Sequence, residues 1–566
     1  MPDSKKTLDL ILLWHMHQPD YRDNETGEFR RPWAYLHALK DYTDMAAHLE
    51  RHPKVRAVVN FVPVLLDQIE DYVRQFDSGV LRDRLLRLLA QENLDALDVE
   101  DRNYIIATCI PGNQVRLVQP FPHFDQLNKL YHQLDAQDEQ ATRYFSGAYF
   151  ADLLVWYHLV WTGETERRCQ PLLAELLAKA QNYTLQDRRA LLALIGSTLR
   201  NLIPRYRALA ERGQIELSTT PHTHPLAPLM LSFASAREAQ PDIPLPQSSE
   251  YPGGRSRVDA HIVAAQHSHL ARFGQTASGM WPAEGAVSDA LLQQLATQGC
   301  RWTASSEAVL VNSLRAGAML DTRANYLYRP WQVNTAPDIT VFFRDEKLSD
   351  LIGFEYANWH GRDAAQHFVA QLDNIRKGAP SSEPPMVGVF LDGENAWEYY
   401  PYNAYHFFED LYSLIEAQTW LNTTTFTQWL DRNPRRAGVL PRLVAGSWVY
   451  GTFSTWIGDA AKNRAWDLLC TAKQSYDIVM SSGRLNEAER AAAEAQLAVC
   501  EGSDWFWWFG DYNPREAVES FDRLFRANLA HLYRFLHLTE PTQLAVPLSH
   551  GIEASTESGG TMRRAS

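Results

Sequence analysis

The sequence predicts an α/β protein built on parallel strands, with a helical insertion and a C-terminal helical domain. Strand-like runs alternate with helical patterns of roughly 10 to 17 residues, and this alternation is typical of parallel β/α organisation. The strand-like runs are apolar on both faces, as expected for a sheet that helices cover on both sides.

Each element of this alternation has a local signature. The apolar run "LDLILLW" (8–14) predicts the first strand. Later strands are predicted at "QIELSTT" (214–220), "TASGMWP" (276–282), "CRWTASS" (300–306) and "PPMVGVFLDGE" (384–394). Helices are predicted at 200–213, 258–274 and 288–299. Each of these helices is closed by a glycine, a common helix stop, and Ser288 is the expected N-cap of the last one.

Two regions depart from the alternation. Residues from about 65 to 200 are mostly helical in pattern and predict an insertion. From 426 to 545 amphipathic helical patterns continue without strands, so we expect a first domain of residues 1–425 and a second, helical domain. Residues 546–566 are small and polar and are predicted to be a disordered tail.

The composition limits the kinds of partner. The chain has 566 residues, 45% of them hydrophobic and 22% charged, which is enough to bury a large core. Its net charge of −14 argues against a nucleic-acid partner, because no general basic field would attract a polyanion. Seventeen Trp and 24 Tyr indicate core packing or the stacking of flat ligands such as sugar rings.

The cysteines and the apolar runs indicate the compartment. Five widely spaced cysteines without a CxxC pair argue against a disulfide framework and against a zinc knuckle, and favour a reducing compartment. The N-terminal apolar run is too short to span a membrane, no small-residue cleavage site follows it, and no other stretch approaches 18 apolar residues. We therefore expect a soluble, cytoplasmic protein.

Two histidines end the first predicted strand, in "HMHQP" (15–19). Residues two apart on a strand share a face, so His15 and His17 should point the same way, at the strand end where parallel β/α folds build their sites. One interpretation is recognition of ligand hydroxyls, because imidazole both donates and accepts hydrogen bonds. The other is metal ligation.

Carboxylates occur at or near two later strands. Glu216 lies inside a short strand, where a carboxylate is costly unless it is paired or bonded; an ion pair on an edge strand is the simpler explanation for it. Glu284 follows Trp281 at the end of the next strand. Glu284 also fits a helix-capping acid, since the next helix begins close by.

The remaining carboxylates lie in "LDGENAWE" (391–398) and "EGSDWFWWFG" (501–510). Asp392 and Glu394 share one face of a strand end, by the same spacing as the histidines. Asp504 lies among tryptophans that include Trp507, and an acid in such surroundings needs bonds to them or to a ligand. Two carboxylates on facing strand ends are the requirement for glycoside hydrolysis: one protonates the leaving oxygen, and the other attacks the anomeric carbon or activates water.

Five segments together resemble the five sequence regions of glycoside hydrolase family 57. They are "HMHQP" (15–19), "GQIEL" (213–217), "MWPAEGA" (280–286), "LDGENAWE" (391–398) and "EGSDWFWWFG" (501–510), in the order of the family. The last three regions and "GSWVYGTFSTWIGDAAKNRAWDLL" (446–469) resemble the α-amylase and amylopullulanase branch more than the branching enzymes.

The resemblance implies a fold and a set of roles. The fold is an incomplete (β/α)7 barrel with a helical domain that completes the active site, and the chemistry is a retaining mechanism on α-glucans. By motif position, Glu284 is the implied nucleophile and Asp392 the implied general acid/base. The implied supporting and substrate-binding residues are His15, His17, Glu216, Trp281, Glu394, Trp397, Asp504 and Trp507, with Arg344 and Asp345 from "FFRDEKLSDLIGF" (342–354).

The expected function is hydrolysis of α-1,4-glucans such as glycogen, starch or maltodextrin through a covalent glycosyl-enzyme. The same residues serve a 4-α-glucanotransferase when a sugar hydroxyl, rather than water, resolves the intermediate. A metal-dependent hydrolase that uses His15 and His17 with Asp392 or Glu216 is a remote alternative. The expected partner is an α-glucan, with no cofactor, metal, nucleic acid or membrane.

Overall fold

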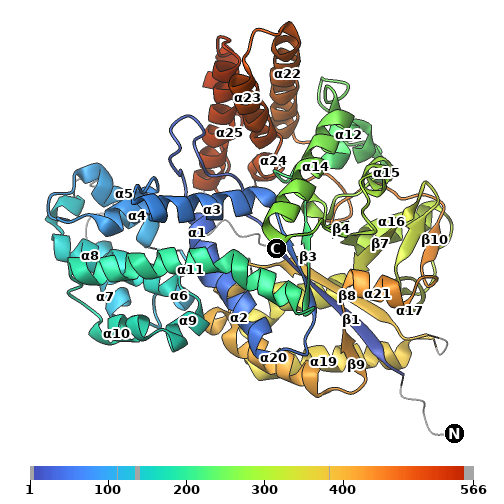
Figure 1. The fold of residues 1–566 in the computed structure, drawn as a ribbon, viewed down its shortest axis with the longest axis horizontal. Coiled ribbons are helices and arrows are strands. Elements are labelled where there is room, and N and C mark those ends of the chain that lie inside the picture. The colour runs from blue at the N-terminus through green and yellow to red at the C-terminus, as the bar shows by residue number, and fades with distance from the viewer. Residues whose placement is uncertain are drawn as a thin grey trace.

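A curled sheet lies at the centre of the protein (Figure 1). The computed structural model describes residues 6–110, 112–133, 141–380, 383–394, 396–510 and 512–552. The strands are β1 (Leu8–Met16), β2 (Ala57–Phe61), β3 (Ile215–Thr219), β4 (Gly279–Met280), β5 (Trp302–Ser306), β6 (Trp331–Val333), β7 (Ala336–Arg344), β8 (Met386–Asp392), β9 (Leu421–Thr423) and β10 (Gly438–Leu440). Their order is β10-β6-β7-β5-β4-β3-β2-β1-β8, and β9 also pairs with β1.

The parallel strands form an incomplete barrel. The path β7-β5-β4-β3-β2-β1-β8 is parallel at every step, whereas β6 runs antiparallel to β7. The two ends of this path approach each other, because the backbone N–H of Asp345 after β7 donates to the carbonyl of Gly388 in β8 at 2.7 Å. The predicted (β/α)7 barrel is therefore confirmed.

Helices follow the strands and pack around the sheet. They include α1 (Trp33–His37), α2 (Thr43–Arg51), α14 (Gly254–Phe273), α15 (Asp289–Thr297), α16 (Glu307–Ala316), α18 (Glu346–Asp350), α19 (Gly361–Gly378), α20 (Tyr405–Ala417) and α21 (Phe426–Arg432), with the π-helical segments η1 (Ala38–Tyr42) and η5 (Leu351–Glu355). The Ser288 hydroxyl accepts a hydrogen bond from the Leu291 N–H, as predicted for an N-cap. None of the described helices is both long and apolar enough to cross a membrane.

A helical lobe separates β2 from β3 and occupies the left of Figure 1. Its helices are α3 (Pro63–Ser78), α4 (Arg84–Ala90), α5 (Val99–Cys109), α6 (Gln114–Leu117), α7 (Pro122–His132), α8 (Gly147–Val160), α9 (Glu164–Cys169), α10 (Pro171–Lys179) and α11 (Leu185–Glu211). The helix predicted at 200–213 is the last part of α11, which continues through Pro204. The earlier part of α11, from Leu185, lies in the region that was predicted to be mostly helical.

The C-terminal helices are α22 (Ala460–Ser482), α23 (Glu487–Cys500), α24 (Asp504–Trp508) and α25 (Arg515–Phe535), at the top of Figure 1. One strand, β10, lies in the region where only helices were expected, and pairs with β6; its three residues are too few to show an alternating pattern. Of the predicted tail, 553–566 lie outside the described residues. Ile552 is bonded through its N–H to the Asn513 carbonyl at 2.9 Å.

A buried ionic cluster joins the C-terminal helices to the barrel. Glu501, which follows α23 and is fully buried, accepts hydrogen bonds from Tyr251 at 2.6 Å and from Arg257 of α14 at 2.8 Å. Its other contact is with the ring of His261, at 2.7 Å. Burial alone would raise the pKa of Glu501, but Arg257 and His261 outweigh it and lower the pKa to about 2.

We expect the Glu501→Gln variant to lose about 3–5 kcal/mol of stability at pH 7, because it leaves a buried guanidinium without its counter-charge. The stability that ionised Glu501 contributes to the wild type is fully present above the ordinary Glu pKa of 4.5 and is lost as the pH falls towards 2. Thermal unfolding at pH 7 and pH 3 measures both effects. Glu494→Gln is the matched control, since Glu494 meets Arg257 from an exposed position; equal losses in the two variants would contradict the prediction.

Candidate active site

One pocket gathers charged and aromatic side chains at the carboxyl ends of the barrel strands. It is lined by residues from β1 and β8, from the segments after β3 and β4, from the segment before α22, and from α24 and α25. These residues are His15, His17, Gln18, Pro19, Tyr21, His224, Glu284, Asp392, Glu394, Trp448, Asp504, Trp507, Trp508 and Phe521. Two larger hollows, of about 580 and 570 Å³, hold none of the predicted site residues.

A row of polar residues crosses four neighbouring strands beneath this pocket. Ser218, Asn60, His15 and Asp392 are successive register partners on β3, β2, β1 and β8. The Asn60 amide donates to the Ser218 hydroxyl at 2.9 Å, and its oxygen lies 2.6 Å from Nδ1 of His15. Nδ1 of His15 therefore carries the proton, and Nε2 faces the pocket as an acceptor.

Glu284 is held in a strained backbone conformation. Its φ is +59° and its ψ is 24°, in the left-handed region that residues other than glycine rarely adopt and that is common at functional sites. Trp448 holds Glu284 through two hydrogen bonds, from its backbone N–H to the Glu284 carbonyl at 2.9 Å and from its indole N–H to Oε2 at 3.0 Å. The conformation turns the carboxyl into the pocket rather than towards the N-terminus of α15.

The charge state of Glu284 depends on its surroundings. Burial and then the negative charge of Asp392 raise the pKa of Glu284 to about 8, against the opposing effect of the Trp448 hydrogen bond. At pH 7, Glu284 therefore holds a proton in most molecules. The two carboxyls are close enough for the charge of one to determine the protonation of the other.

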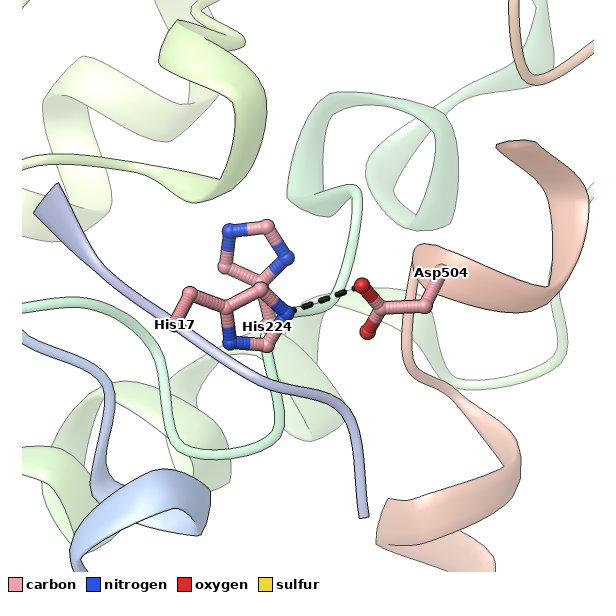
Figure 2. A group of neighbouring side chains, drawn as sticks. All are labelled: His17, His224 and Asp504. Atoms are coloured by element: carbon pink, nitrogen blue, oxygen red, sulfur yellow. Dashed lines mark hydrogen bonds and ion pairs between the residues drawn. The ribbon is translucent and has the colours of Figure 1, made fainter. Parts of the chain in front are cut away.

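Three imidazoles lie beside these carboxyls. The rings of His17 and His224 stack with centroids 3.7 Å apart, and Nε2 of His15 lies 3.3 Å from Nε2 of His224. His17 is hydrogen-bonded to Asp504 at 2.8 Å, which Figure 2 shows as the dashed line. Burial and the neighbouring rings lower the pKa of His15 to about 3 and the pKa of His224 well below its usual value, so both are neutral at pH 7.

His17, His224 and Asp504 together resemble a metal site, since their ligand atoms lie within 4.8 Å of one another (Figure 2). The lone pair of a ring nitrogen lies in the plane of the ring. The planes of the His17 and His224 rings are inclined by 23°, and their centroids are 3.7 Å apart. The two planes therefore intersect much farther from the ring nitrogens than the roughly 2 Å of a zinc–nitrogen bond, so one ion cannot lie in both planes at bonding distance. This geometry fits hydrogen bonding to ligand hydroxyls better than shared ligation of one ion.

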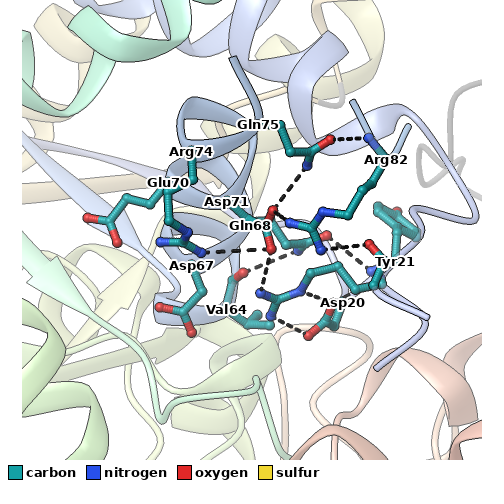
Figure 3. Close-up of polar contacts among 12 residues, drawn as sticks. Asp20, Tyr21, Val64, Asp67, Gln68, Glu70, Asp71, Arg74, Gln75 and Arg82 are labelled. Carbon is teal, nitrogen blue, oxygen red and sulfur yellow. Dashed lines mark hydrogen bonds and ion pairs between the residues drawn. The ribbon is translucent and has the colours of Figure 1, made fainter. Parts of the chain in front are cut away.

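Glu394 is positioned by a chain of hydrogen bonds that begins on α3. Gln68 accepts from the Tyr21 backbone at 3.1 Å and donates to the Pro19 carbonyl at 2.9 Å, within the network of Figure 3. The Tyr21 hydroxyl donates to Gln18 at 2.9 Å, and the Gln18 amide donates to Oε1 of Glu394 at 3.2 Å. A Cβ on the preceding residue, Gly393, would lie 1.9 Å from the Met16 sulfur, so a larger residue there would displace the Met16 side chain.

Three residues expected in the site lie elsewhere. Glu216 accepts hydrogen bonds from Trp302 at 2.7 Å and from Thr427 at 2.6 Å, on the side of the barrel where β9 meets the start of β1. Asp345 caps α18 and pairs with Arg323 at 2.7 Å. In each case donors within the fold satisfy the carboxylate, and neither residue lines the pocket.

Trp397 is the third of these residues. It is 1% exposed, its indole N–H donates to the Gly393 carbonyl at 2.7 Å, and its ring packs edge-on against Trp14 and Phe408. The ring that was expected to stack on a sugar is therefore part of the core. An aromatic residue after a strand end gives the same sequence pattern in either role.

Two further expected residues lie behind the pocket wall. Trp281 is fully buried and meets Trp448 edge-on at 5.1 Å. The Arg344 guanidinium lies over the ring of Trp448 at 5.1 Å. Both pack on the indole that bonds Glu284. Among the predicted aromatic residues, Trp507 lines the pocket itself.

Several lining residues were not assigned to the site from the sequence. His224 follows β3 with the same His-x-His spacing as His15 and His17, which is the signal that identifies it; His222 of that pair instead contacts Asp67 at 3.1 Å. Trp448 lies in the family-like segment 446–469. Gln18 and Trp508 lie in the family-like segments 15–19 and 501–510, whereas Tyr21 and Phe521 carry no such signal.

Comparisons with known proteins agree with this site and fold. The family model described as Glycosyl hydrolase family 57 matches residues 11–441. No curated protein sequence matches the chain.

Solved structures with a similar fold include enzymes of this family. A branching enzyme from Thermococcus kodakaraensis has a TM-score of 0.58 at 16% identity, over 94% of this chain and 90% of its own. An α-amylase from Thermotoga maritima has a TM-score of 0.56 at 13% identity, over 94% of this chain and 93% of its own. A 4-alpha-glucanotransferase from Thermococcus litoralis has a TM-score of 0.52 at 14% identity, over 94% of this chain and 60% of its own. Because the family model matches most of this chain, residues 11–441, the chain belongs to glycosyl hydrolase family 57.

Proposed function

We propose that the protein is a retaining α-1,4-glucan hydrolase in which Glu284 is the nucleophile and Asp392 the general acid/base. The observation that carries this proposal is that the two carboxyls line one pocket from different strand ends, and that the charge of Asp392 raises the pKa of Glu284. Family membership supports the reaction class. The tryptophans of the pocket, Trp448, Trp507 and Trp508, supply apolar faces for sugar rings.

The mechanism requires one proton on the pair. Glu284 attacks the anomeric carbon as a carboxylate while Asp392 protonates the leaving oxygen, and Asp392 then acts as the base that activates water. Burial and the charge of Asp392 favour the proton on Glu284, whose pKa is about 8. The indole N–H of Trp448 stabilises the charged form of Glu284, so this bond favours the arrangement that reacts.

Transfer to a sugar hydroxyl is the second candidate function. It uses the same two carboxyls, and the proteins of similar fold include a 4-alpha-glucanotransferase and a branching enzyme as well as an α-amylase. What differs is whether water or a sugar hydroxyl reaches the glycosyl-enzyme. Products distinguish the two reactions.

We expect Glu284→Gln to lose at least about 10³-fold in kcat on maltooligosaccharides, because the amide cannot form the glycosyl-enzyme. Asp392→Asn should lose about 10² to 10⁴-fold through loss of proton transfer. Initial rates on maltoheptaose measure both. The matched control is Glu216→Gln, which changes a half-buried glutamate outside the pocket and should retain near-normal kcat; an active E284Q would remove Glu284 from the nucleophile role.

Incubation of the wild-type enzyme with maltotriose distinguishes hydrolysis from transfer. A hydrolase gives glucose and maltose alone, because water resolves the intermediate. A transferase gives longer oligosaccharides from the start of the reaction. Chromatography of the products over time is the measurement, and early accumulation of maltotetraose and maltopentaose would overturn hydrolysis as the main activity.

The raised pKa of Glu284 has a consequence for stability. Between pH 4.5 and about 8 the folded chain keeps a proton on Glu284 that the unfolded chain has released, so stability from this group falls as the pH rises through that window. The amide of the Glu284→Gln variant cannot ionise. We expect this variant to gain about 4 kcal/mol of stability relative to the wild type between pH 5 and pH 9. Thermal unfolding across this range measures the difference, and a gap that does not change with pH would contradict it.

A further inference from the structure

The loop that carries Trp448 continues into a tight turn. The backbone N–H of Thr452 donates to the Val449 carbonyl at 3.3 Å, which closes a turn of four residues. Its two central residues, Tyr450 and Gly451, have φ of +57° and +67°. Two left-handed central residues are characteristic of a type I′ turn, in which asparagine, aspartate or glycine is preferred. Gly451 fits this preference, and Tyr450 does not.

Tyr450 is held in this conformation at a cost in stability. A bulky side chain rarely adopts a positive φ, and residues that do so cluster at functional sites. Two residues of the pocket share the feature, Glu284 with φ of +59° and His224 with φ of +61°. The Tyr450 side chain is 67% exposed, so burial of its ring does not offset the strain. Packing in the core therefore does not explain a tyrosine at this position.

The turn is fixed against the barrel at the same end as the pocket. The Ser447 hydroxyl donates to the Thr452 carbonyl at 2.7 Å, and the Asn312 amide of α16 donates to the Gly451 carbonyl at 3.3 Å. The packing is close, since a Cβ on Gly451 would lie 2.8 Å from the Cβ of Ala308. Because α16 begins directly after β5, these contacts place the turn at the carboxyl end of that strand.

Trp448 connects the turn to the reacting carboxyls. It bonds Glu284 through its backbone and its indole, and it lines the pocket. Two residues of chain span at most about 7 Å, so the Tyr450 backbone lies within that distance of the Trp448 backbone. Tyr450 is not among the residues that line the pocket. Its exposed ring therefore lies outside the pocket, on the loop that supplies part of the pocket wall.

We propose that Tyr450 binds α-glucan chains outside the pocket, with its ring stacked on the face of one sugar unit, and so favours chains long enough to reach it. The identity of the ligand rests on the proposed function. A tyrosine ring offers a flat apolar face, and its hydroxyl donates to or accepts from sugar hydroxyls. The hydrogen bonds of the turn fix the backbone beneath this ring before the chain binds, which reduces the entropy cost of binding.

Variants of Tyr450 test the inference on two substrates, maltoheptaose and the shortest maltooligosaccharide that the wild type cleaves. We expect Tyr450→Asn to lower kcat/KM about 3- to 10-fold on maltoheptaose and to stay within about 2-fold of the wild type on the short substrate. Tyr450→Phe keeps the ring and should stay within about 2-fold on both. Asparagine suits a type I′ turn, so the Tm of Y450N should equal or exceed that of the wild type.

Tyr144→Asn is the matched control, because Tyr144 is 71% exposed on the helical lobe, and it should leave both rates unchanged. Equal losses of Y450N on the two substrates would overturn the inference, since they would indicate a disturbed contact between Trp448 and Glu284. So would an unchanged rate of Y450N on maltoheptaose, or a loss in Y450F as large as in Y450N. If Y450N does not fold, Tyr450→Gly replaces it, because glycine adopts a positive φ freely. Failure of the proposed function would instead leave the wild type without turnover of maltooligosaccharides.

Discussion

The repulsion between buried carboxyls in one pocket is the constraint on which the site depends. The barrel brings Asp392 and Glu284 together from different strands, and the C-terminal helices cover them and supply Asp504. Burial makes ionisation costly, and each charge makes the next one costlier. Burial and then the charge of Asp392 therefore raise the pKa of Glu284, and the hydrogen bond from Trp448 opposes that rise.

The long regular elements were predictable from the sequence. The runs that became β1, β3, β5 and β8 are apolar and bounded by turns, and glycines marked the ends of the helices between them. The short strands β9 and β10 were not predictable, because they have three residues each and their pairing depends on neighbours far away in the chain. The two residues of β4 lie inside the strand predicted at 276–282. The number of strands in the barrel came from the family resemblance, since β2 and β7 gave no separate signal.

The site residues also divide into those that the sequence identifies and those that it does not. The alternation of side chains along a strand and the position of a residue in its motif identify side chains that face the pocket, such as those of His15 and Asp392. They do not distinguish these from carboxylates and rings satisfied inside the fold, as with Glu216 and Trp397. That distinction depends on which donors lie within hydrogen-bond distance, and those donors come from distant segments. Glu216 is a clear example, because Thr427 lies 211 residues away.

The position of β1 has a consequence for synthesis of the protein. This first strand lies in the middle of the sheet, paired with β2 and β9 on one side and with β8 on the other, and β8 begins only at Met386. A ribosome needs roughly 20–75 s to make the intervening chain. Throughout that interval one edge of an apolar strand is open to other nascent chains. The yield of active enzyme therefore depends on elongation rate and chaperone supply as well as on the stability of the finished fold.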